Sequence, residues 1–548
     1  NFGRFVSDFK AFDKSGKELK VDRVDENRWK IAQARDCDKI TYWVEDTWDS
    51  RVEGGSIFEP GGTNIEAGKN FVINTFGFFG YFEGMKEVPI KLTVEHPAGF
   101  YGSTSLIATD DNPNSDVFEV ENYHYLADAP MMYCKPDTSI RKVGGADVLV
   151  SVYSPNDRVG ADAIMKDIAE ILSAQKDYLG GELPVEKYAF IIYLTDNVGG
   201  SGGMGALEHS YSSLYYMPET GEDEAGAMMR DVAAHEFFHI VTPLNIHSEE
   251  IHDFDYIDPK MSRHLWLYEG VTEYSAGHVQ VKHELISTVD YLGILRSKIM
   301  MSSFFLDTVP FTEISSNCLH EYKGQYMNVY QKGALIGMAL DIKLRELSDG
   351  KMGMQELMKE LAKTYGKDQA FRDPELFDKI TELTYPEVRT FFKEYVEGPN
   401  PLPFEEIFAS VGIKFEPFAN RKVLTTGRVG MEWDKEKGRF VVESTKRMNK
   451  FGRQLGLEKG DEIVSFDGQE LNIRNLAEVV ADFQKRHKAG DKIVVMVDRP
   501  DDSGNLKRKK LKAKAQLVNL RGRNILTLNP DATEKQIATR RAWLGGPK

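Results

Sequence analysis

The chain has 548 residues, of which 41% are hydrophobic and 28% are charged, and its formal net charge is −16. This length is too great for one hydrophobic core and predicts roughly three or four domains. The acidic balance argues against a nucleic-acid-binding protein and against binding to anionic membrane surfaces. The absence of a run of about 18 apolar residues predicts no integral membrane segment. The cysteines at positions 37, 134 and 318 lie far apart and predict no disulfide framework.

The first part of the chain, residues 1–155, is predicted to be β structure. Segments 39–44, 90–94 and 148–153 are rich in β-branched and aromatic residues. Clusters of Gly, Pro, Asn and Asp separate such segments. This pattern favours an N-terminal β-sandwich.

Residues 156–415 show a mainly helical pattern. Apolar residues recur at helical spacing within 161–179, and the apolar run at 188–194 predicts a strand. Further helices are predicted near 224–241, 264–281, 325–347, 354–365, 373–383 and 385–396. The prolines at 401 and 403 then break the chain.

Short strands return after residue 420, together with an amphipathic helix near 474–487. Gly460-Asp461 leads into an apolar strand, and Asp467-Gly468 follows as a hairpin turn. We therefore expect a third domain over residues 420–518 and a C-terminal tail over 519–548.

The motif His235-Glu236-Phe237-Phe238-His239 lies within one predicted helix. Positions i and i+4 share a helical face, so both imidazoles can bind one metal ion. Zinc polarises a scissile carbonyl and lowers the pKa of a water molecule. A carboxylate at Glu236 can accept the proton of that water and pass it to the leaving amine.

A second predicted helix supplies two further carboxylates. A catalytic zinc takes a third protein ligand and keeps a fourth position open. Glu269 is the candidate, because Trp266, Leu267 and Tyr268 beside it argue against a solvated position. Glu273 lies one helical turn later, where it can orient a ligating His through a hydrogen bond.

This arrangement resembles the gluzincin metallopeptidases, in which a Glu on the next helix follows the HExxH motif. Upstream, Gly205-Ala206-Leu207-Glu208-His209 is similar to the Gly-Ala-Met-Glu-Asn strand of the large aminopeptidases. The resemblance implies that Gly205, Ala206, Glu208 and His209 bind the substrate. In those enzymes the edge strand pairs with the substrate backbone, and its Glu holds the free α-amine.

Downstream, Tyr330-Gln331-Lys332-Gly333 looks like the family's Tyr-x-Lys-Gly segment. There the Tyr donates a hydrogen bond to the tetrahedral oxyanion. The resemblance therefore implies a catalytic role for Tyr330 beside Glu236. The alternative is that Tyr330 is one more aromatic residue of a helix.

The segment 455–469 resembles a bacterial PDZ domain, which implies a peptide ligand in its groove or, alternatively, a spacer whose groove is blocked.

The predicted β-sandwich, the gluzincin-like motifs and the PDZ-like segment together resemble the glycyl aminopeptidase family of PDZ-bearing metallopeptidases. The resemblance implies a multidomain α+β protein with a β-sandwich, a thermolysin-like catalytic domain and a PDZ-like domain. Gly3-Arg4-Phe5-Val6 resembles a stretch that normally follows two or three strands, so the first strands of the domain are expected to precede Asn1.

These observations predict a peptidase with one Zn²⁺ per chain that removes small N-terminal residues, of the Gly or Ala type, from peptides or proteins with a free N-terminus. An endopeptidase on the same zinc site is the first alternative, and a non-catalytic peptide-binding protein is the second. Residues 240–250 depart from the family's Trp-Asn segment, which places the preference for small residues in question. His247 and His252 lie there without ligand spacing, and we do not count them as ligands.

Overall fold

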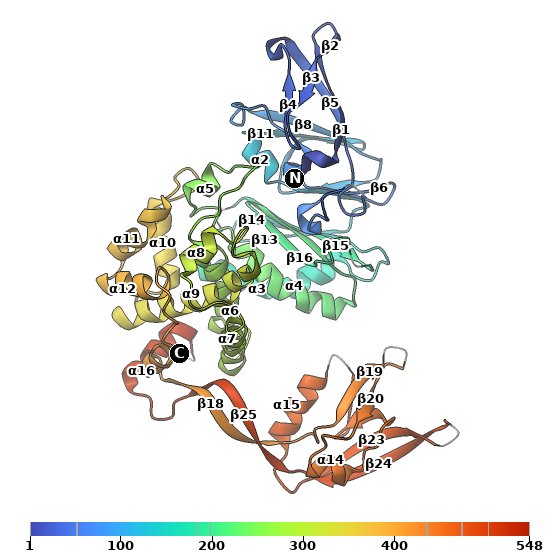
Figure 1. Ribbon diagram of the computed structural model, residues 1–548, viewed down its shortest axis with the longest axis vertical. Coiled ribbons are helices and arrows are strands. Elements are labelled where there is room, and N and C mark those ends of the chain that lie inside the picture. The colour runs from blue at the N-terminus through green and yellow to red at the C-terminus, as the bar shows by residue number, and fades with distance from the viewer. Residues whose placement is uncertain are drawn as a thin grey trace. The chain divides into compact units, whose positions relative to one another are not determined.

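The computed structural model describes residues 2–50, 53–183, 185–197, 199–434, 437–472, 475–501 and 504–546 (Figure 1). The chain forms two units. The first comprises Asn1–Lys414 with Leu526–Lys548, and the second comprises Phe415–Ile525. In the described part, no helix is both long and apolar enough to cross a membrane. The three cysteines, Cys37, Cys134 and Cys318, are free.

The N-terminal part of the first unit is rich in β-sheet, as predicted. Its strands are β1 (Val6–Asp13), β2 (Glu18–Leu19), β3 (Val21–Arg23), β4 (Trp29–Ile31), β5 (Cys37–Val44), β6 (Asn64–Glu66), β7 (Asn70–Ile73), β8 (Ile90–Glu95), β9 (Tyr101–Ser103), β10 (Ala108–Asn112), β11 (Ser115–Val120) and β12 (Met131–Cys134). They pair in the orders β2-β1-β5, β3-β4, β10-β11-β8 and β6-β7-β12-β9. Two short helices, α1 (Thr75–Phe78) and α2 (Tyr123–Ala127), lie among them.

A five-stranded sheet forms the centre of the first unit. Its strands are β13 (Thr138–Val143), β14 (Ala146–Tyr153), β15 (Lys187–Thr195), β16 (Gly205–His209) and β17 (Ser212–Pro218), in the order β13-β14-β15-β17-β16. β14, β15 and β17 run parallel, whereas β16 is an antiparallel edge strand. We expected residues 148–153 in the N-terminal sandwich, but they belong to β14. The reason is that β14 is buried on both faces, as strands of parallel sheets are.

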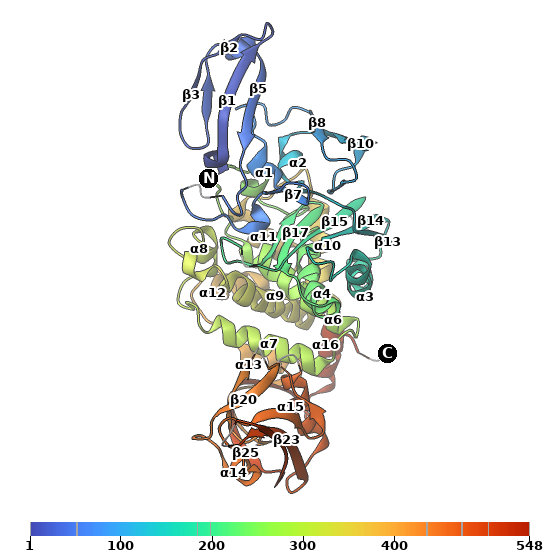
Figure 2. The same cartoon turned by 90° about the vertical axis from the view of Figure 1, so that its right-hand side faces the viewer.

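The two faces of this sheet are covered by different parts of the chain. Helices α3 (Ala161–Leu179) and α4 (Glu222–Phe238) cover one face, where Ile168 and Phe237 pack against Phe190 (Figure 2). Val72 and Met132 of the N-terminal strands cover the other face. The edge strand β16 therefore lies between a helical layer and the N-terminal part.

The rest of the first unit is helical, as predicted. It contains α5 (Glu249–His252), α6 (Thr272–Lys282), α7 (Thr288–Ser302), α8 (Phe311–Ser316), α9 (Asn328–Leu347), α10 (Met354–Thr364), α11 (Leu376–Leu383), α12 (Pro386–Tyr395), α13 (Phe404–Ser410) and α16 (Glu534–Leu544). α7 was not predicted. α16 lies within the expected C-terminal tail, yet its Trp543 is buried and donates an indole hydrogen bond to the Tyr274 hydroxyl at 2.8 Å.

The second unit is built around one antiparallel sheet. Its strands are β19 (Gly430–Asp434), β20 (Arg439–Ser444), β21 (Glu462–Phe466), β22 (Gln469–Glu470), β23 (Lys492–Pro500) and β24 (Leu506–Lys514), and β22 pairs with β21. The helices α14 (Lys450–Leu455) and α15 (Leu476–Arg486) accompany it. β18 (Ile413–Leu424) and β25 (Leu517–Leu528) pair with each other. Residue 474, the first of the helix expected near 474–487, lies outside the described residues.

Candidate metal centre

Helix α4 carries the HExxH motif and is anchored at the end that bears it. Three acidic residues in its first turn stabilise the helix, because their negative charges lie at the positive end of the helix dipole. Near the other end, Gln175 donates a hydrogen bond to the Ala234 carbonyl at 2.8 Å, and the Tyr188 hydroxyl donates to the Glu236 carbonyl at 3.3 Å. The helix ends at Phe238, but the next residue keeps a helical backbone. The rings of His235 and His239 therefore share one face, with centroids 5.0 Å apart.

Glu269 lies in a π-helical segment, Trp266–Val271, where the sequence predicted an ordinary helix. Such wide turns occur often at functional sites. At the next residue, Gly270, the backbone of this segment touches the backbone of α9. A Cβ on Gly270 would lie 2.4 Å from the carbonyl carbon of Gly333. A side chain at either glycine would separate the two helices. Their close approach places Tyr330, one turn before Gly333, with its ring centroid 5.6 Å from that of His235.

His235, His239 and Glu269 converge at one buried point. Glu269 Oε2 lies 3.4 Å from His235 Nε2 and 3.7 Å from His239 Nε2. Each residue offers a ligand atom within 4.8 Å of the others. Among the described residues, neither His239 Nε2 nor Glu269 Oε2 has a hydrogen-bond partner, although both atoms are buried. Buried polar atoms without partners are costly, so two imidazole nitrogens and a carboxylate fit a divalent cation such as zinc.

Hydrogen bonds at the far side of each imidazole fix its orientation. His235 Nδ1 lies 2.8 Å from Glu273 Oε2, and His239 Nδ1 donates to the Thr242 carbonyl at 3.0 Å. Glu273 also accepts a hydrogen bond from Lys298 at 2.5 Å. Burial alone would raise the pKa of Glu273, but the bonds and charges of His235 and Lys298 hold it well below its usual range. Glu273 is therefore an ionised partner that turns Nε2 of His235 toward the centre.

Glu236 lies beside the three converging residues and is almost fully buried. Its Oε2 atom has no hydrogen-bond partner among the described residues. Burial and the negative charge of Glu269 raise the pKa of Glu236 to about 7, although the charge of His235 opposes the shift. A bound cation would lower this pKa again. The carboxyl group is thus placed to accept and release a proton near neutral pH.

The edge strand β16 presents Glu208 to the same space. Glu208, Glu236 and His239 form a second group whose ligand atoms lie within 4.8 Å of one another. Burial, with the charges of Glu269 and Glu236, raises the pKa of Glu208 well above its usual range. Such a carboxyl group gains from a cationic partner.

Successive residues of β16 point to opposite faces. Ala206 packs toward α3 and α4 on the same side as Glu208. His209, which the resemblance placed among the substrate-binding residues, points the other way. Its Nδ1 lies 3.1 Å from Asp128 Oδ1, in the N-terminal part. The structure therefore brings Glu208 to the metal group but not the His209 side chain.

Sequence reasoning missed three residues of the site: Thr242, Lys298 and Tyr326. The ring of Tyr326 lies beside that of Tyr330, with centroids 6.0 Å apart. Lys298 lies on the unpredicted helix α7, and Thr242 acts through its backbone carbonyl, so neither leaves a signal in the local sequence. Tyr326 precedes Tyr330 by four residues, and this helical spacing was the one signal in the sequence that could have indicated it.

The rings of His247 and His252 stack, with His247 Nε2 3.1 Å from His252 Nδ1. Among the described residues they join no group of three potential ligands.

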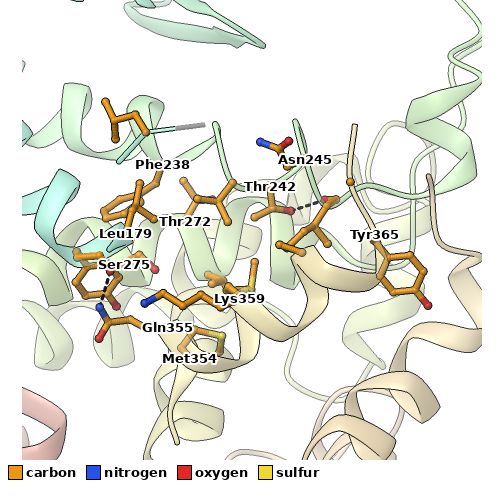
Figure 3. Close-up of a pocket in the computed structure, with 18 of the residues that line it drawn as sticks. Leu179, Phe238, Thr242, Asn245, Thr272, Ser275, Met354, Gln355, Lys359 and Tyr365 are labelled. Atoms are coloured by element: carbon orange, nitrogen blue, oxygen red, sulfur yellow. Dashed lines mark hydrogen bonds between the residues drawn. The ribbon is translucent and has the colours of Figure 1, made fainter. Parts of the chain in front are cut away.

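A cavity of about 420 Å³ lies next to the segments that carry the ligands (Figure 3). It is lined by Phe238, which directly precedes His239, and by Thr242 and Thr272, each of which follows a ligand by three residues. None of the predicted catalytic, metal-binding or substrate-binding residues lines it. The chemistry is therefore to be sought along the edge strand β16 and not in this cavity.

Two family models match the chain. The Peptidase M61 N-terminal domain matches residues 1–135, and the M61 glycyl aminopeptidase domain matches residues 228–336. The chain thus contains two regions that match the M61 peptidase family. This confirms the family resemblance seen in the sequence and supports hydrolysis of peptides. The second match contains the HExxH motif, Glu269, Glu273 and Tyr330, whereas Glu208 lies outside it.

An aminopeptidase N family protein from Idiomarina loihiensis has a similar fold: it is 20% identical, the match covers 100% of this chain and 92% of that chain, and the TM-score is 0.68. An M1 zinc metallopeptidase from Deinococcus radiodurans is 15% identical, the match covers 73% of this chain and 85% of that chain, and the TM-score is 0.47. A mutant of that metallopeptidase was solved with a Tyr-Ser-Ala substrate; it is 16% identical, with the same coverage and TM-score. No curated protein sequence matches the chain.

Proposed function

We propose that the protein is a zinc aminopeptidase that removes small N-terminal residues from peptides. One observation carries the proposal: the unpartnered ligand atoms of His239 and Glu269 lie beside Glu236, and Glu208 lies within reach of the same point. The three ligands of one Zn²⁺ per chain are His235, His239 and Glu269. Zinc, when bound there, polarises the scissile carbonyl and lowers the pKa of a water molecule.

Glu236 and Tyr330 carry the proton transfer and the charge stabilisation. Glu236 accepts the proton of the attacking water and returns it to the leaving amine. The Tyr330 hydroxyl donates a hydrogen bond to the developing oxyanion from a half-buried position, where such a bond is worth more than in water. Glu273 keeps His235 in position through both steps, because its own charge is secured by Lys298.

Glu208 gives the enzyme its preference for a free N-terminus. The peptide extends the sheet at β16 by strand addition, with its backbone along Gly205 and Ala206. Its ammonium group then meets the Glu208 carboxylate in a charge-assisted hydrogen bond, about twice as strong as a neutral one. Because the anchored amine fixes the distance to the metal, one residue leaves in each cleavage.

The test compares free and N-acetylated forms of the same peptide. Acetylation removes the cationic partner of Glu208 and leaves a half-buried carboxyl group unpaired, so we expect the free peptide to be cleaved at least about 10-fold faster. Glu208→Gln keeps the shape of the side chain but loses the charge, and should erase most of the difference. Internal cuts in acetylated peptides at comparable rates, seen by mass spectrometry, would make the protein an endopeptidase on the same site.

A second candidate function is peptide binding by residues 420–518 as a PDZ-like domain. The observation that favours it is an apolar pocket of about 100 Å³ lined by Val429 and Met431, beside β19, and by Leu476 and Val480 of α15. β19 is an edge strand of the described sheet, so a peptide could pair with it. Met431→Asp should weaken binding of apolar peptides measured by calorimetry, while the alternative, a spacer, predicts no peptide binding by the wild type.

A further inference from the structure

An exposed phenylalanine of the N-terminal part lies directly against the edge strand. Phe58 is 42% exposed, and a Cβ on Gly205 would lie 3.3 Å from its Cζ. The same ring approaches Gly203, where a Cβ would lie 3.1 Å from Phe58 Cδ2. Glycine at both positions leaves room for the ring. An apolar side chain thus remains open to solvent at the end of β16 away from Glu208.

Hydrogen bonds on both sides of Phe58 hold it in this place. Before it, the Ser56 hydroxyl donates to the Gly200 carbonyl at 2.9 Å. After it, the Glu59 carboxylate accepts hydrogen bonds from the backbone and side chain of Ser201. The indole of Trp48 donates to the Glu59 carbonyl at 2.9 Å. The segment around Phe58 is therefore joined to the loop that leads into β16, and the ring is positioned before any ligand arrives.

The geometry of a peptide strand on β16 shows what would meet this ring. A peptide whose amine is held at Glu208 runs antiparallel to β16, toward Gly205. Three residues separate these positions, or about 10 Å at roughly 3.3 Å per residue. The peptide therefore reaches Gly205 with its third or fourth residue.

Alternate side chains of such a peptide point toward the N-terminal part. Leu207 of β16 already faces that side, because its Cδ2 would lie 3.8 Å from a Cβ on Gly61. A peptide side chain on that side, opposite Gly205, would lie over the ring of Phe58.

We infer that Phe58 forms an apolar subsite for the third or fourth residue of the peptide, counted from the free amine. This inference rests on the proposed function. It narrows the preferred substrates. Among peptides with a small first residue, those that carry an aliphatic or aromatic side chain two or three residues beyond it are favoured. Aromatic rings gain from such contacts beyond the area they bury.

The experiment uses the full, metal-loaded chain and measures kcat/KM. The substrates are alanine p-nitroanilide, which is too short to reach Phe58, and Ala-Ala-X-Ala and Ala-Ala-Ala-X with X either Leu or Asp. We expect the wild type to prefer Leu to Asp by about 10-fold at one of the two positions, the lower end of the discrimination that an apolar pocket gives.

Phe58→Ala should lose this preference and keep its activity on the anilide. Trp43→Ala, which removes an aromatic residue 70% exposed on β5, is the matched control and should change neither.

A second variant separates a subsite from a structural role. Phe58→Asp should reverse the preference for an apolar residue, so that peptides with Lys at the same position are cleaved faster than those with Leu. Poor folding would not produce such a gain. A wild type without preference at either position, a preference retained in Phe58→Ala, or no reversal in Phe58→Asp would overturn the inference. A wild type inactive on the anilide as well as on the peptides would refute the proposed function, and the inference with it.

Discussion

The Glu236→Gln variant is expected to fold and bind metal normally but to hydrolyse peptides about 100- to 10,000-fold more slowly than the wild type, the usual contribution of a general base. The amide keeps the size of the side chain but cannot accept the proton of the attacking water. Glu236 is buried, and its Oε2 atom has no hydrogen-bond partner among the described residues, so the carboxylate is available to take that proton. The measurement is kcat on a peptide with a free N-terminal alanine.

Glu222→Gln is the matched control, because it makes the same change in the first turn of the same helix, at an exposed position. Its turnover should stay close to that of the wild type. Near-normal turnover of Glu236→Gln would remove Glu236 from the mechanism and leave the site without a base.

The Tyr330→Phe variant should lose about 100- to 1,000-fold in kcat with little change in KM, because one donor to an oxyanion commonly contributes that much. The hydroxyl acts only when negative charge develops, so binding of the uncharged carbonyl is little affected. Tyr326→Phe is the control, since its ring lies beside that of Tyr330, with centroids 6.0 Å apart. We expect it to lose less than about 10-fold, at most the effect of one neutral hydrogen bond. The reverse order of the two variants would assign the donor role to Tyr326, and a rise in KM alone would make Tyr330 a binding residue.

The sequence predicted those parts of the site that depend on spacing within one element. The i and i+4 positions of His235 and His239 follow from helical geometry alone. Glu269 could be chosen because its apolar neighbours argued for burial. The π-helical turn around it could not be foreseen, because it depends on the contact between Gly270 and Gly333, which belong to different helices.

Contacts between distant parts of the chain account for the rest. Lys298 reaches Glu273 only because α7 packs beside α6, and nothing near either residue indicates that pairing. His209 was grouped with Glu208 by motif, although the alternation of side chains along a strand sends neighbours to opposite faces. β14 was assigned to the N-terminal part because a strand buried on both faces looks the same in sequence whichever sheet it joins.

The central claim is that His235, His239 and Glu269 hold one zinc ion at which Glu236 acts. The most direct test is the zinc content per chain, measured by mass spectrometry after dialysis, of the wild type, Glu236→Gln and His239→Ala. We predict about one zinc per chain in the wild type and in Glu236→Gln, because a catalytic zinc takes three protein ligands and Glu236 is not among them. His239→Ala should lose most of its zinc. Full zinc retention by His239→Ala, or loss of zinc from Glu236→Gln, would contradict the assignment of ligands and base.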